Sequence, residues 1–454
     1  MTESSRPTLT FYGAAGTVTG SRYLLKTPTS RVLIDCGLFQ GLKKWRERNW
    51  HPFPEPASSI DGVFLTHAHL DHSGYLPALV KQGFRGPIFA TEATYELCKI
   101  LLADAAKLQE EEAAYNNRHH TSKHNPALPL FTQEDAQQAL KLFEPVKNSA
   151  SFNDLTVTFS PNGHILGSSY LDVDIGGKHI VFSGDLGRPH DIIMNPPEPP
   201  CYADYLIMES TYGNRLHDNR DINDCLADAV STTLASGGDV LVPAFAIGRA
   251  QSVLYTLHKL QRQQKIPYVP IYLDSPMAIS ATELMIRFNQ QHRLSKQQCR
   301  EMEENVKFLR TVEQSMALNE TQFPCIIVSA SGMATGGRVL YHLERLLPER
   351  RNTIIFAGYQ AAGTRGDRLV RGEDSVKIHG RYYPVKAQIL NFDFLSAHAD
   401  RDEMLTWLKK IPVAPKHCFI THGEQESSTA FADTINHYLG WNTSTPSLGE
   451  TIEL

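Results

Sequence analysis

Three histidines and one aspartate fall within six consecutive positions, in the segment Thr66-His67-Ala68-His69-Leu70-Asp71-His72. Imidazole nitrogens and carboxylate oxygens are ligands that suit zinc. Because neighbouring side chains leave the backbone in different directions, one turn cannot aim all four at a single ion. The simplest arrangement places His67 and His69 on one ion, and Asp71 and His72 on a second. Two ions held this close together can drive water into phosphate or acyl bonds.

A solvated, histidine-rich loop is the competing interpretation of this segment. Histidine accounts for only 19 of the 454 residues, so three within six positions beside an aspartate are not expected from composition. The apolar run from Gly62 to Leu65 leads directly into the segment, as a strand would lead into an ordered site. The pattern therefore favours a metal centre.

Short apolar runs that end in polar residues recur from residue 8 to about residue 210. Asp35, His164, Asp185 and Glu209 each follow such a run, and the pattern returns before His422. Sites in layered α/β proteins collect at strand ends. The metal ligands predicted in this way are His67, His69, Asp71, His72, His164, Asp185 and His422.

These residues are enough for two four-coordinate zinc ions if one carboxylate is shared. Asp185 is the expected bridge, since a carboxylate has two oxygens and an imidazole cannot span both ions. Each ion then keeps one position for a shared water, which zinc ionises at about pH 7. Two Zn²⁺, two ionised aspartates and one hydroxide sum to a charge of +1, which suits an anionic substrate such as a phosphodiester.

Asp35, Glu209 and His398 are left for supporting roles. Asp35 either orients a ligand imidazole or caps the turn that it begins, and both interpretations stay open. A histidine supported by a carboxylate is a suitable general acid for a departing oxygen, because its pKa lies near working pH. His398 with Glu209 is the candidate pair.

The composition is that of an ordinary globular protein, with 41% hydrophobic and 20% charged residues. The net charge of −5 means that a nucleic acid would have to be held by a local patch or by metal. The seven cysteines include no C-x-x-C pair, which fits a reducing compartment. The N-terminus has no apolar leader and no run reaches transmembrane length, so we expect a cytoplasmic location and no membrane partner.

From about residue 218 to residue 359 the chain alternates strands with longer helices. This alternation predicts a parallel sheet covered by helices, and the ligand pattern resumes only after it. The block is therefore expected to be inserted into the first domain. We predict residues 1–212 as the first part of that domain, 213–387 as the insert and 388–454 as the second part.

A loop rich in small residues, 329–338, lies between a strand and a helix of the insert. Ser329, Ser331 and Gly332 are candidates for binding a substrate phosphate there, although a glycine-rich loop alone is a weak signal. Basic side chains between residues 363 and 386 form either a phosphate-binding patch or a solvated face.

The H-x-H-x-D-H segment, with His164, Asp185 and His422, resembles the metallo-β-lactamase superfamily. The insert, with Glu209 and His398, resembles its β-CASP branch of nucleic-acid-processing nucleases, and the likeness covers essentially the whole chain. It is strongest to the prokaryotic relatives of the cleavage and polyadenylation endonuclease. The resemblance implies an α/β fold, in which a metallo-β-lactamase αββα sandwich carries an inserted β-CASP parallel-sheet domain. It also implies two zinc ions, with manganese as an alternative.

In that family, the residues matching His67, His69, His164 and Asp185 hold the first ion. Those matching Asp71, His72, Asp185 and His422 hold the second. The resemblance further gives catalytic roles to Asp71, Glu209 and His398. It implies attack of metal-bound hydroxide on phosphorus, leaving a 3′-hydroxyl and a 5′-phosphate. A histidine at position 422 is typical of members that process RNA.

These expectations together predict a zinc-dependent endoribonuclease of RNA processing or decay, which cuts single-stranded RNA in a cleft between the two domains. The alternatives are a 5′-to-3′ exoribonuclease, a small-molecule metallo-hydrolase acting on a thioester or lactam, and a non-catalytic RNA-binding module. The KH-type extension of archaeal relatives and the long C-terminal domain of the ribonuclease J kind are not recognised. A homodimer and the RNA selectivity are therefore left open.

Overall fold

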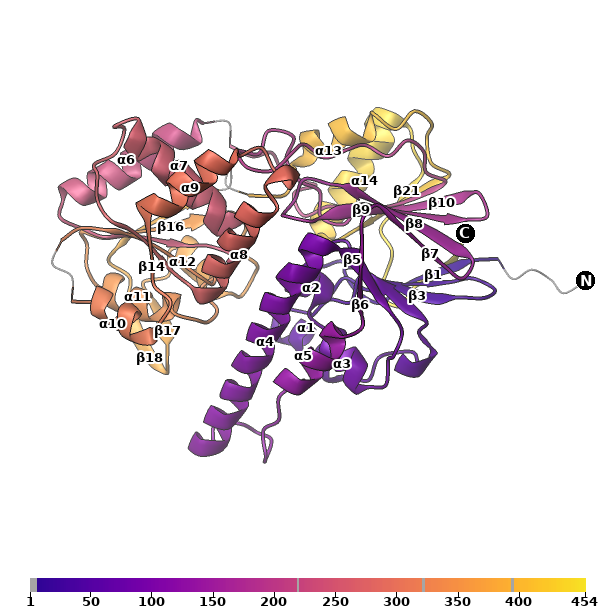
Figure 1. Ribbon diagram of the computed structural model, residues 1–454, viewed down its shortest axis with the longest axis horizontal. Helices are drawn as coiled ribbons and strands as arrows, with labels where there is room; N and C mark the ends of the chain where they lie inside the picture. The colour runs from indigo at the N-terminus through magenta and orange to yellow at the C-terminus, as the bar shows by residue number, and fades with distance from the viewer. Residues whose placement is uncertain (1–5, 219, 321–322, 393–395) are drawn as a thin grey trace, which may run out of the picture. The chain divides into compact units, whose positions relative to one another are not determined.

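The chain forms two compact units in the computed structural model, which describes residues 6–218, 220–320, 323–392 and 396–454 (Figure 1). Unit 1 comprises Met1–Asp191, Asn195–Leu216 and His398–Leu454, and unit 2 comprises Ile192–Met194 and His217–Ala397. The chain thus leaves unit 1, builds unit 2 and returns. The boundaries expected after residues 212 and 387 stay predictions. Among the described residues, no helix is long and apolar enough to cross a membrane.

Two seven-stranded sheets form the centre of unit 1 (Figure 1). The first has the order β22-β1-β2-β3-β4-β5-β6 and the second the order β21-β20-β11-β10-β9-β8-β7. Alternate apolar residues of both sheets, such as Phe64 and Leu171, belong to one buried core, so the sheets pack face to face. The strands are Thr8–Phe11 (β1), Tyr23–Lys26 (β2), Arg31–Ile34 (β3), Gly62–Phe64 (β4), Ile88–Thr91 (β5), Phe143–Val146 (β6), Ser149–Phe152 (β7), Leu155–Pro161 (β8), Ser169–Ile175 (β9), Lys178–Phe182 (β10), Tyr205–Glu209 (β11), His417–Thr421 (β20), Thr443–Ser444 (β21) and Thr451–Glu453 (β22).

Helices cover the outer faces of both sheets and complete the αββα layers. Met404 and Trp407 of α13 and Phe431 of α14 share a buried cluster with the second sheet. Helix α4 lies against β5 and β6 of the first sheet. It spans Glu92–His119, and the side chain of Thr91 caps its N-terminus. The helices and 3-10 turns of unit 1 are Lys43–Arg46 (α1), Glu47–Trp50 (η1), Ala57–Ser59 (η2), Leu70–Ser73 (α2), Leu76–Lys81 (α3), α4, Gln133–Leu140 (α5), Arg401–Leu408 (α13) and Gln425–Leu439 (α14).

Unit 2 is built on a six-stranded sheet of order β14-β13-β15-β12-β16-β19, in which every strand pair is parallel. One apolar cluster lies under α6 to α9 and another under α10 to α12, so helices cover both faces. The predicted fold class is therefore confirmed. The elements are Ile222–Ala235 (α6), Val240–Pro243 (β12), Arg249–Arg262 (α7), Ile271–Asp274 (β13), Pro276–Arg287 (α8), Asn289–Gln291 (η3), Lys296–Asn305 (α9), Val306–Phe308 (β14), Val312–Leu318 (α10), Ile326–Ser329 (β15), Val339–Leu346 (α11), Thr353–Ala357 (β16), Arg365–Val370 (α12), Ser375–Ile378 (β17), Arg381–Pro384 (β18) and Gln388–Phe392 (β19).

The strands that carry the predicted site residues end at common edges. Strands β10, β11 and β20 are mutually parallel, and β8 runs in the same direction because β9 is antiparallel to both β8 and β10. In the first sheet, β3 and β4 are also parallel. The residues that follow these strands are thereby brought to the same end of each sheet.

A buried carboxylate stabilises the interior of unit 2. Asp274, at the end of β13, is fully buried and accepts hydrogen bonds from Arg338 Nη1 at 2.7 Å and Ser315 Oγ at 2.5 Å. Its Oδ2 lies 2.7 Å from His342 Nε2. Burial by itself would raise the pKa of Asp274, but these hydrogen bonds hold that pKa below its ordinary value.

Replacing Asp274 with alanine should lower the free energy of unfolding of unit 2 by about 3 kcal/mol, because Arg338 and His342 lose their shared partner. Urea titration at pH 7 measures the change. The matched control is Glu283→Ala, which removes an exposed ion pair with Arg310 and should cost less than about 1 kcal/mol. Since the folded pKa is lowered, the stabilisation is complete above the unfolded pKa of about 3.9 and is lost as pH falls through the folded pKa. An equal effect of both substitutions at pH 7 would contradict this role.

Candidate metal centre

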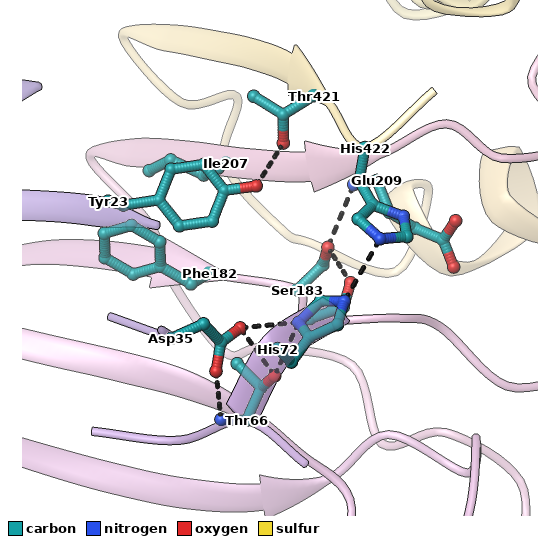
Figure 2. Close-up of a pocket in the computed structure, with 11 residues that line it drawn as sticks. Tyr23, Asp35, Thr66, His72, Phe182, Ser183, Ile207, Glu209, Thr421 and His422 are labelled. Carbon is teal, nitrogen blue, oxygen red and sulfur yellow. Dashed lines mark hydrogen bonds and ion pairs between the residues drawn. The ribbon is translucent and has the colours of Figure 1, made fainter. Parts of the chain in front are cut away.

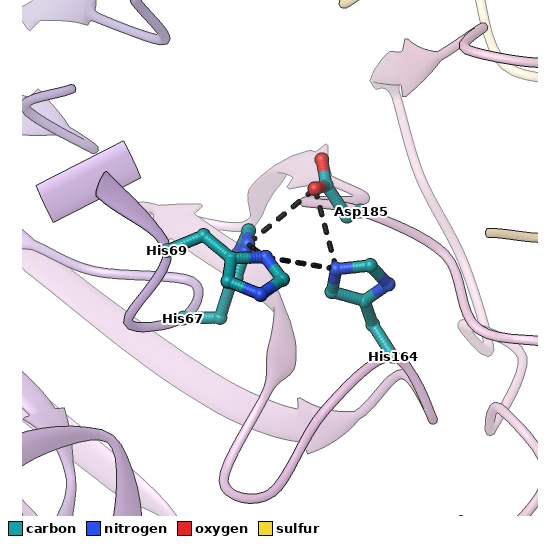
Figure 3. Close-up of side chains that lie close together, drawn as sticks. All are labelled: His67, His69, His164 and Asp185. Atoms are coloured by element: carbon teal, nitrogen blue, oxygen red, sulfur yellow. Dashed lines mark hydrogen bonds and ion pairs between the residues drawn. The ribbon is translucent and has the colours of Figure 1, made fainter. Parts of the chain in front are cut away.

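Four predicted ligands form a first group in unit 1 (Figure 3). The group contains His67, His69, His164 and Asp185, whose ligand atoms all lie within 4.8 Å of one another. His69 Nδ1 lies 3.1 Å from both His67 Nε2 and His164 Nε2. Asp185 Oδ2 lies 3.4 Å from His67 Nε2 and 3.5 Å from His164 Nε2. Ligands bound at about 2.1 Å to a tetrahedral ion would lie about 3.4 Å apart, so the spacing is that of a four-coordinate site.

A second group contains Asp71, His72, Asp185 and His422, again with ligand atoms within 4.8 Å of one another. His72 Nε2 lies 3.1 Å from His422 Nε2 and 3.1 Å from Asp185 Oδ1. His422 Nε2 lies 3.4 Å from Asp71 Oδ2. Asp185 therefore presents Oδ2 to the first group and Oδ1 to the second. The structure brings all seven predicted ligands together, with Asp185 between the groups.

The polar atoms of both groups are arranged as ligands of divalent metal ions would be. Asp185 Oδ1 is buried and has no hydrogen-bond partner among the described residues. Buried polar atoms are normally paired, so a buried carboxylate oxygen without a hydrogen-bond partner, facing imidazole nitrogens, suits a cation. Several imidazole nitrogens also face each other at 3.1 Å, and a shared cation would accept the lone pairs of both nitrogens of such a pair.

The titration of the first group and of the shared carboxylate also suits a cation. Burial lowers the pKa of His67 to about 3, with a further contribution from the nearby His72. Burial, followed by His398, holds the pKa of His164 well below its ordinary value. Burial opposes the charged form of Asp185, but the surrounding histidines, His422 first, hold its pKa well below the ordinary range. The first group thus offers neutral imidazoles and the shared carboxylate is ionised, which are the protonation states that metals bind.

Asp35 contacts the ring nitrogen of His72 that does not face the second ligand group (Figure 2). Its Oδ2 lies 2.7 Å from His72 Nδ1, and it accepts hydrogen bonds from the backbone N and the hydroxyl of Thr66, both at 2.8 Å. Burial disfavours the charged form of His72, but Asp185 and Asp35 raise its pKa well above the ordinary value. Of the two interpretations of Asp35, the structure supports the orienting one. Thr66 was not predicted as a site residue, and only its place next to His67 could have indicated it.

Replacing Asp35 with asparagine should weaken metal binding by about 10–100-fold, since such partners fix the orientation and basicity of ligand histidines. The asparagine would turn its amide NH₂ toward either His72 or Thr66, each of which now donates to a carboxylate oxygen. A competition titration with a chromogenic chelator measures the affinity. Asp154→Asn is the control, because Asp154 also accepts from a hydroxyl, that of Ser30 at 2.5 Å, outside the two ligand groups. Unchanged affinity in the Asp35 variant would show that the turn alone holds His72.

The backbone at two site residues adopts a conformation that side chains usually avoid. Asp35 has φ of 58° and His422 has φ of 49°, both in the left-handed region. Each follows directly on a strand, β3 or β20, and the sharp turn aims its side chain back across the sheet edge. Such conformations persist where the surrounding structure holds them, and they collect at functional sites.

His398 and Glu209 form the predicted pair. His398 Nδ1 lies 3.1 Å from Glu209 Oε1, and His398 Nε2 lies 4.0 Å from Asp185 Oδ2. Burial lowers the pKa of His398, but the carboxylates of Glu209, Asp185 and Asp71 together raise that pKa above its ordinary value, with Glu209 contributing most. Glu209 is itself fixed by the backbone N–H groups of Leu186, at 2.6 Å, and Thr211, at 3.1 Å. The pair holds a proton on an imidazole that faces the ligand groups.

The ligand groups are only partly shielded from solvent. Asp71 and His398 retain 20% and 18% of their side-chain exposure and His69 is half-buried, whereas His67, His164 and Asp185 are buried. A substrate can therefore come close to the buried ligands beside Asp71 and His398.

The predicted phosphate loop lies in unit 2, after β15. The Ser329 hydroxyl is buried and donates to the backbone carbonyl of Asp274 at 2.9 Å. Ser331 Oγ accepts from the backbone N of Thr335 at 3.0 Å, and Gly332 packs against the backbone of Phe245. The two hydroxyls and the glycine thus already have contacts within the protein, and the role of the loop toward phosphate stays a prediction.

The basic residues between 363 and 386 are partly neutralised. Arg368 pairs with Glu373 at 2.6 Å, and Arg371 pairs with Asp367 at 2.8 Å. Arg365 donates to the backbone carbonyls of Lys377 and Ala334. Three of the arginines are therefore used within the fold, which favours the solvated face among the two interpretations left open.

Comparison with protein families matches three parts of the chain. Residues 24–197 match a metallo-beta-lactamase superfamily domain, and residues 250–369 match a Beta-Casp domain. Residues 382–446, which include His398 and His422, match a Zn-dependent metallo-hydrolase RNA specificity domain. A chain similar along its length is Ribonuclease TTHA0252 of Thermus thermophilus, 37% identical over 93% of this chain and 95% of that one. The chain belongs to the β-CASP family of metallo-β-lactamase-fold hydrolases. As a member it is a metal-dependent hydrolase, a hydrolytic nuclease.

Other relatives of this β-CASP hydrolase carry different names. Transcription termination factor FttA of Methanosarcina mazei is 32% identical over 98% of this chain and 71% of its own length. An RNase J-like protein of Methanocaldococcus jannaschii is 30% identical over 94% of this chain and 95% of its own length. A crystal structure of a protein of unknown function from Enterococcus faecalis matches with a TM-score of 0.54, covering 99% of this chain and all of that one. At 14% identity, that likeness shows the fold alone.

Proposed function

We propose that this protein is a zinc-dependent endoribonuclease that hydrolyses phosphodiester bonds of single-stranded RNA, with two metal ions at the two ligand groups. One observation carries the proposal: Asp185 presents one oxygen to each group, next to the His398–Glu209 pair. The relatives named as ribonucleases and the match to an RNA specificity domain support RNA as the substrate. Seven unpaired cysteines support a reducing compartment, for which the cytoplasm is the proposed location.

Nitrogen and oxygen donors in two groups of four favour zinc, with manganese as the alternative. Bound there, the ions would supply a nucleophile at neutral pH and offset the charge of the phosphate. The first ion would be held by His67, His69, His164 and Asp185, and the second by Asp71, His72, Asp185 and His422. The carboxylate of Asp185 keeps the two groups at a fixed separation.

His398 acts as the general acid in this proposal. Its Nδ1 is held by Glu209, so that Nε2 faces the ligand groups and can donate a proton to the departing 3′-oxygen. Glu209 stabilises the protonated imidazole and fixes its tautomer. A proton delivered there leaves a 3′-hydroxyl on one product and a 5′-phosphate on the other.

A flexible single strand is the expected form of the RNA. Most of the ligands are buried, whereas Asp71 and His398 are partly exposed, so the scissile phosphate has to come close to groups that lie below the protein surface. A single strand can bend to present one phosphate and splay its bases, whereas a stacked duplex holds its phosphates on a stiff backbone.

Two RNAs of the same sequence test the proposal, one circular and one linear with a 5′-monophosphate, each incubated with zinc-loaded protein. We expect the circle to be cut, because an endonuclease needs no end. Degradation of the linear RNA alone would overturn the endonucleolytic mode in favour of a 5′-to-3′ exoribonuclease. If both RNAs stay intact while zinc is bound, RNA is the wrong substrate, and hydrolysis of a thioester or lactam is the next activity to measure.

A further inference from the structure

A short basic and aromatic segment lies beside the ligand groups in unit 1 and has no part in the chemistry described so far. Residues 43–50, which form α1 and η1, read Lys-Lys-Trp-Arg-Glu-Arg-Asn-Trp. They carry four cationic side chains and one carboxylate, in a chain whose net charge is −5. All four cationic side chains are exposed. The local charge therefore opposes that of the whole molecule.

The 43–50 segment is fixed to the turn that carries the ligands. Asn49 accepts from the backbone N of Phe39 at 2.9 Å and donates to its carbonyl at 2.7 Å. One residue earlier, the backbone N of Leu38 donates to Leu70 at 2.8 Å. Gly37 approaches Asp71 so closely that a Cβ would lie 1.6 Å from the Asp71 carbonyl oxygen. The segment thus has a rigid connection to the exposed ligand Asp71.

Aromatic rings order the cationic side chains of the segment. Trp45 stacks on Phe39 with a ring distance of 5.9 Å, and the charged ends of Lys44 and Arg48 lie 5.1 Å and 5.4 Å from the Trp45 ring. Trp50, in contrast, is 58% exposed, whereas Trp407 and Trp441 are 2% and 6% exposed. The exposed indole of Trp50 offers an aromatic surface to solvent, and a base of a single strand is a suitable stacking partner for it.

The negative groups near the segment neutralise only part of its charge. Lys43 pairs with Glu47 at 3.4 Å, with both side chains more than half exposed. Lys44 interacts electrostatically with Glu424, two residues beyond the predicted ligand His422. These contacts leave Arg46 and Arg48 without an acidic partner among the described residues. The interaction of Lys44 with Glu424 also places the segment near His422 of the second ligand group.

We propose that the 43–50 segment binds the RNA strand next to the scissile phosphate, with Arg46 and Arg48 contacting backbone phosphates and Trp50 stacking on a base. This rests on the proposed function, since it assumes that the substrate is RNA. Cationic side chains that follow the backbone, together with an aromatic platform, are the usual means of holding a single strand without sequence preference. The metal centre would then act on a phosphate near one that the segment already holds.

Binding of a fluorescent single-stranded RNA to the zinc-loaded His398→Ala protein, which we expect to cut it about 10²–10⁴-fold more slowly, tests the proposal. Adding Arg46→Glu and Arg48→Glu should weaken binding by roughly tenfold and reduce the slope of log K against log salt by about 1.4, since each phosphate contact to a single strand contributes about 0.7. The matched control is Lys141→Glu with Lys147→Glu, which makes the same charge change at exposed positions of the same unit. Trp50→Ala should weaken binding by roughly tenfold, and Trp50→Phe should restore most of it.

The outcomes separate this inference from the proposed function. If the parent protein binds no RNA, the proposed substrate is wrong and the inference fails with it. If the parent binds RNA but the Arg46/Arg48 variant matches the Lys141/Lys147 control in affinity and salt slope, only the inference is overturned, and the segment serves another partner such as a protein. Circular dichroism of each variant shows whether the fold is retained.

Discussion

Replacing His398 with alanine should lower kcat for RNA cleavage by about 10²–10⁴-fold while leaving the metal content unchanged. The imidazole holds its proton 3.1 Å from Glu209 and faces the ligand groups with its other nitrogen, but it belongs to neither group of four. Its loss therefore removes proton delivery to the leaving oxygen and leaves the metal ligands in place. Single-turnover cleavage of an RNA of defined length, with metal content measured by mass spectrometry, gives both quantities.

A substrate with sulfur in place of the 3′-bridging oxygen tests the role assigned to His398. A thiolate leaves without a proton, so the His398→Ala variant should recover most of its lost rate on this RNA. His179→Ala is the matched control, because His179 also contacts a carboxylate, Asp172, at 3.0 Å, but away from the ligand groups. Equal loss on the oxygen and sulfur substrates would mean that His398 positions the RNA and does not protonate it.

Replacing Asp185 with alanine should remove both metal ions and reduce cleavage to background. Asp185 contributes one oxygen to each ligand group, so its loss weakens both sites at once, whereas His69→Ala and Asp71→Ala each remove a ligand from one group. Metal content per chain should therefore fall from about two to near zero in the first variant and to about one in the others. Zinc at about 100 times its Kd should raise the stability of the unmodified protein by about 2.7 kcal/mol for each site, and this gain should disappear in Asp185→Ala.

Thermal unfolding with and without zinc, together with the metal content, measures this result. The protein without metal serves as the reference for folding, since a variant that merely fails to bind should unfold at the same temperature as that reference. Retention of one tightly bound ion by Asp185→Ala would show that the carboxylate serves a single site.

Much of the fold and of the centre could be predicted from the sequence, for a simple geometric reason. Apolar strands that each end in a metal-type side chain must place those side chains together once the strands are parallel, as β10, β11 and β20 are. The alternation of strands and helices after residue 218 likewise predicted the parallel sheet of unit 2. These patterns depend on local periodicity and on the order of elements along the chain, and both are written in the sequence.

Other features of the centre depended on how distant segments meet. Asp35 could be an orienting residue or a turn cap until His72 was placed 2.7 Å from it, 37 positions along the chain. His69 faces the first ligand group with Nδ1, whereas His67 and His164 face it with Nε2. The orientation of each ring decides this, and the spacing of residues along the sequence does not predict it. The contact of Ser329 also depends on packing: its hydroxyl donates to the backbone carbonyl of Asp274 in β13, which its place in a loop rich in small residues does not indicate.

The sequence by itself determined the kinds of ligand, their places at strand ends and the presence of an inserted α/β unit. Tertiary structure alone decided which nitrogen of each histidine faces the ligand groups, and that Thr66 and Asp35 support His72. The physical reason is that residue type and periodicity fix what each segment offers, whereas distances of about 3 Å between side chains depend on the angle and register at which separate segments pack.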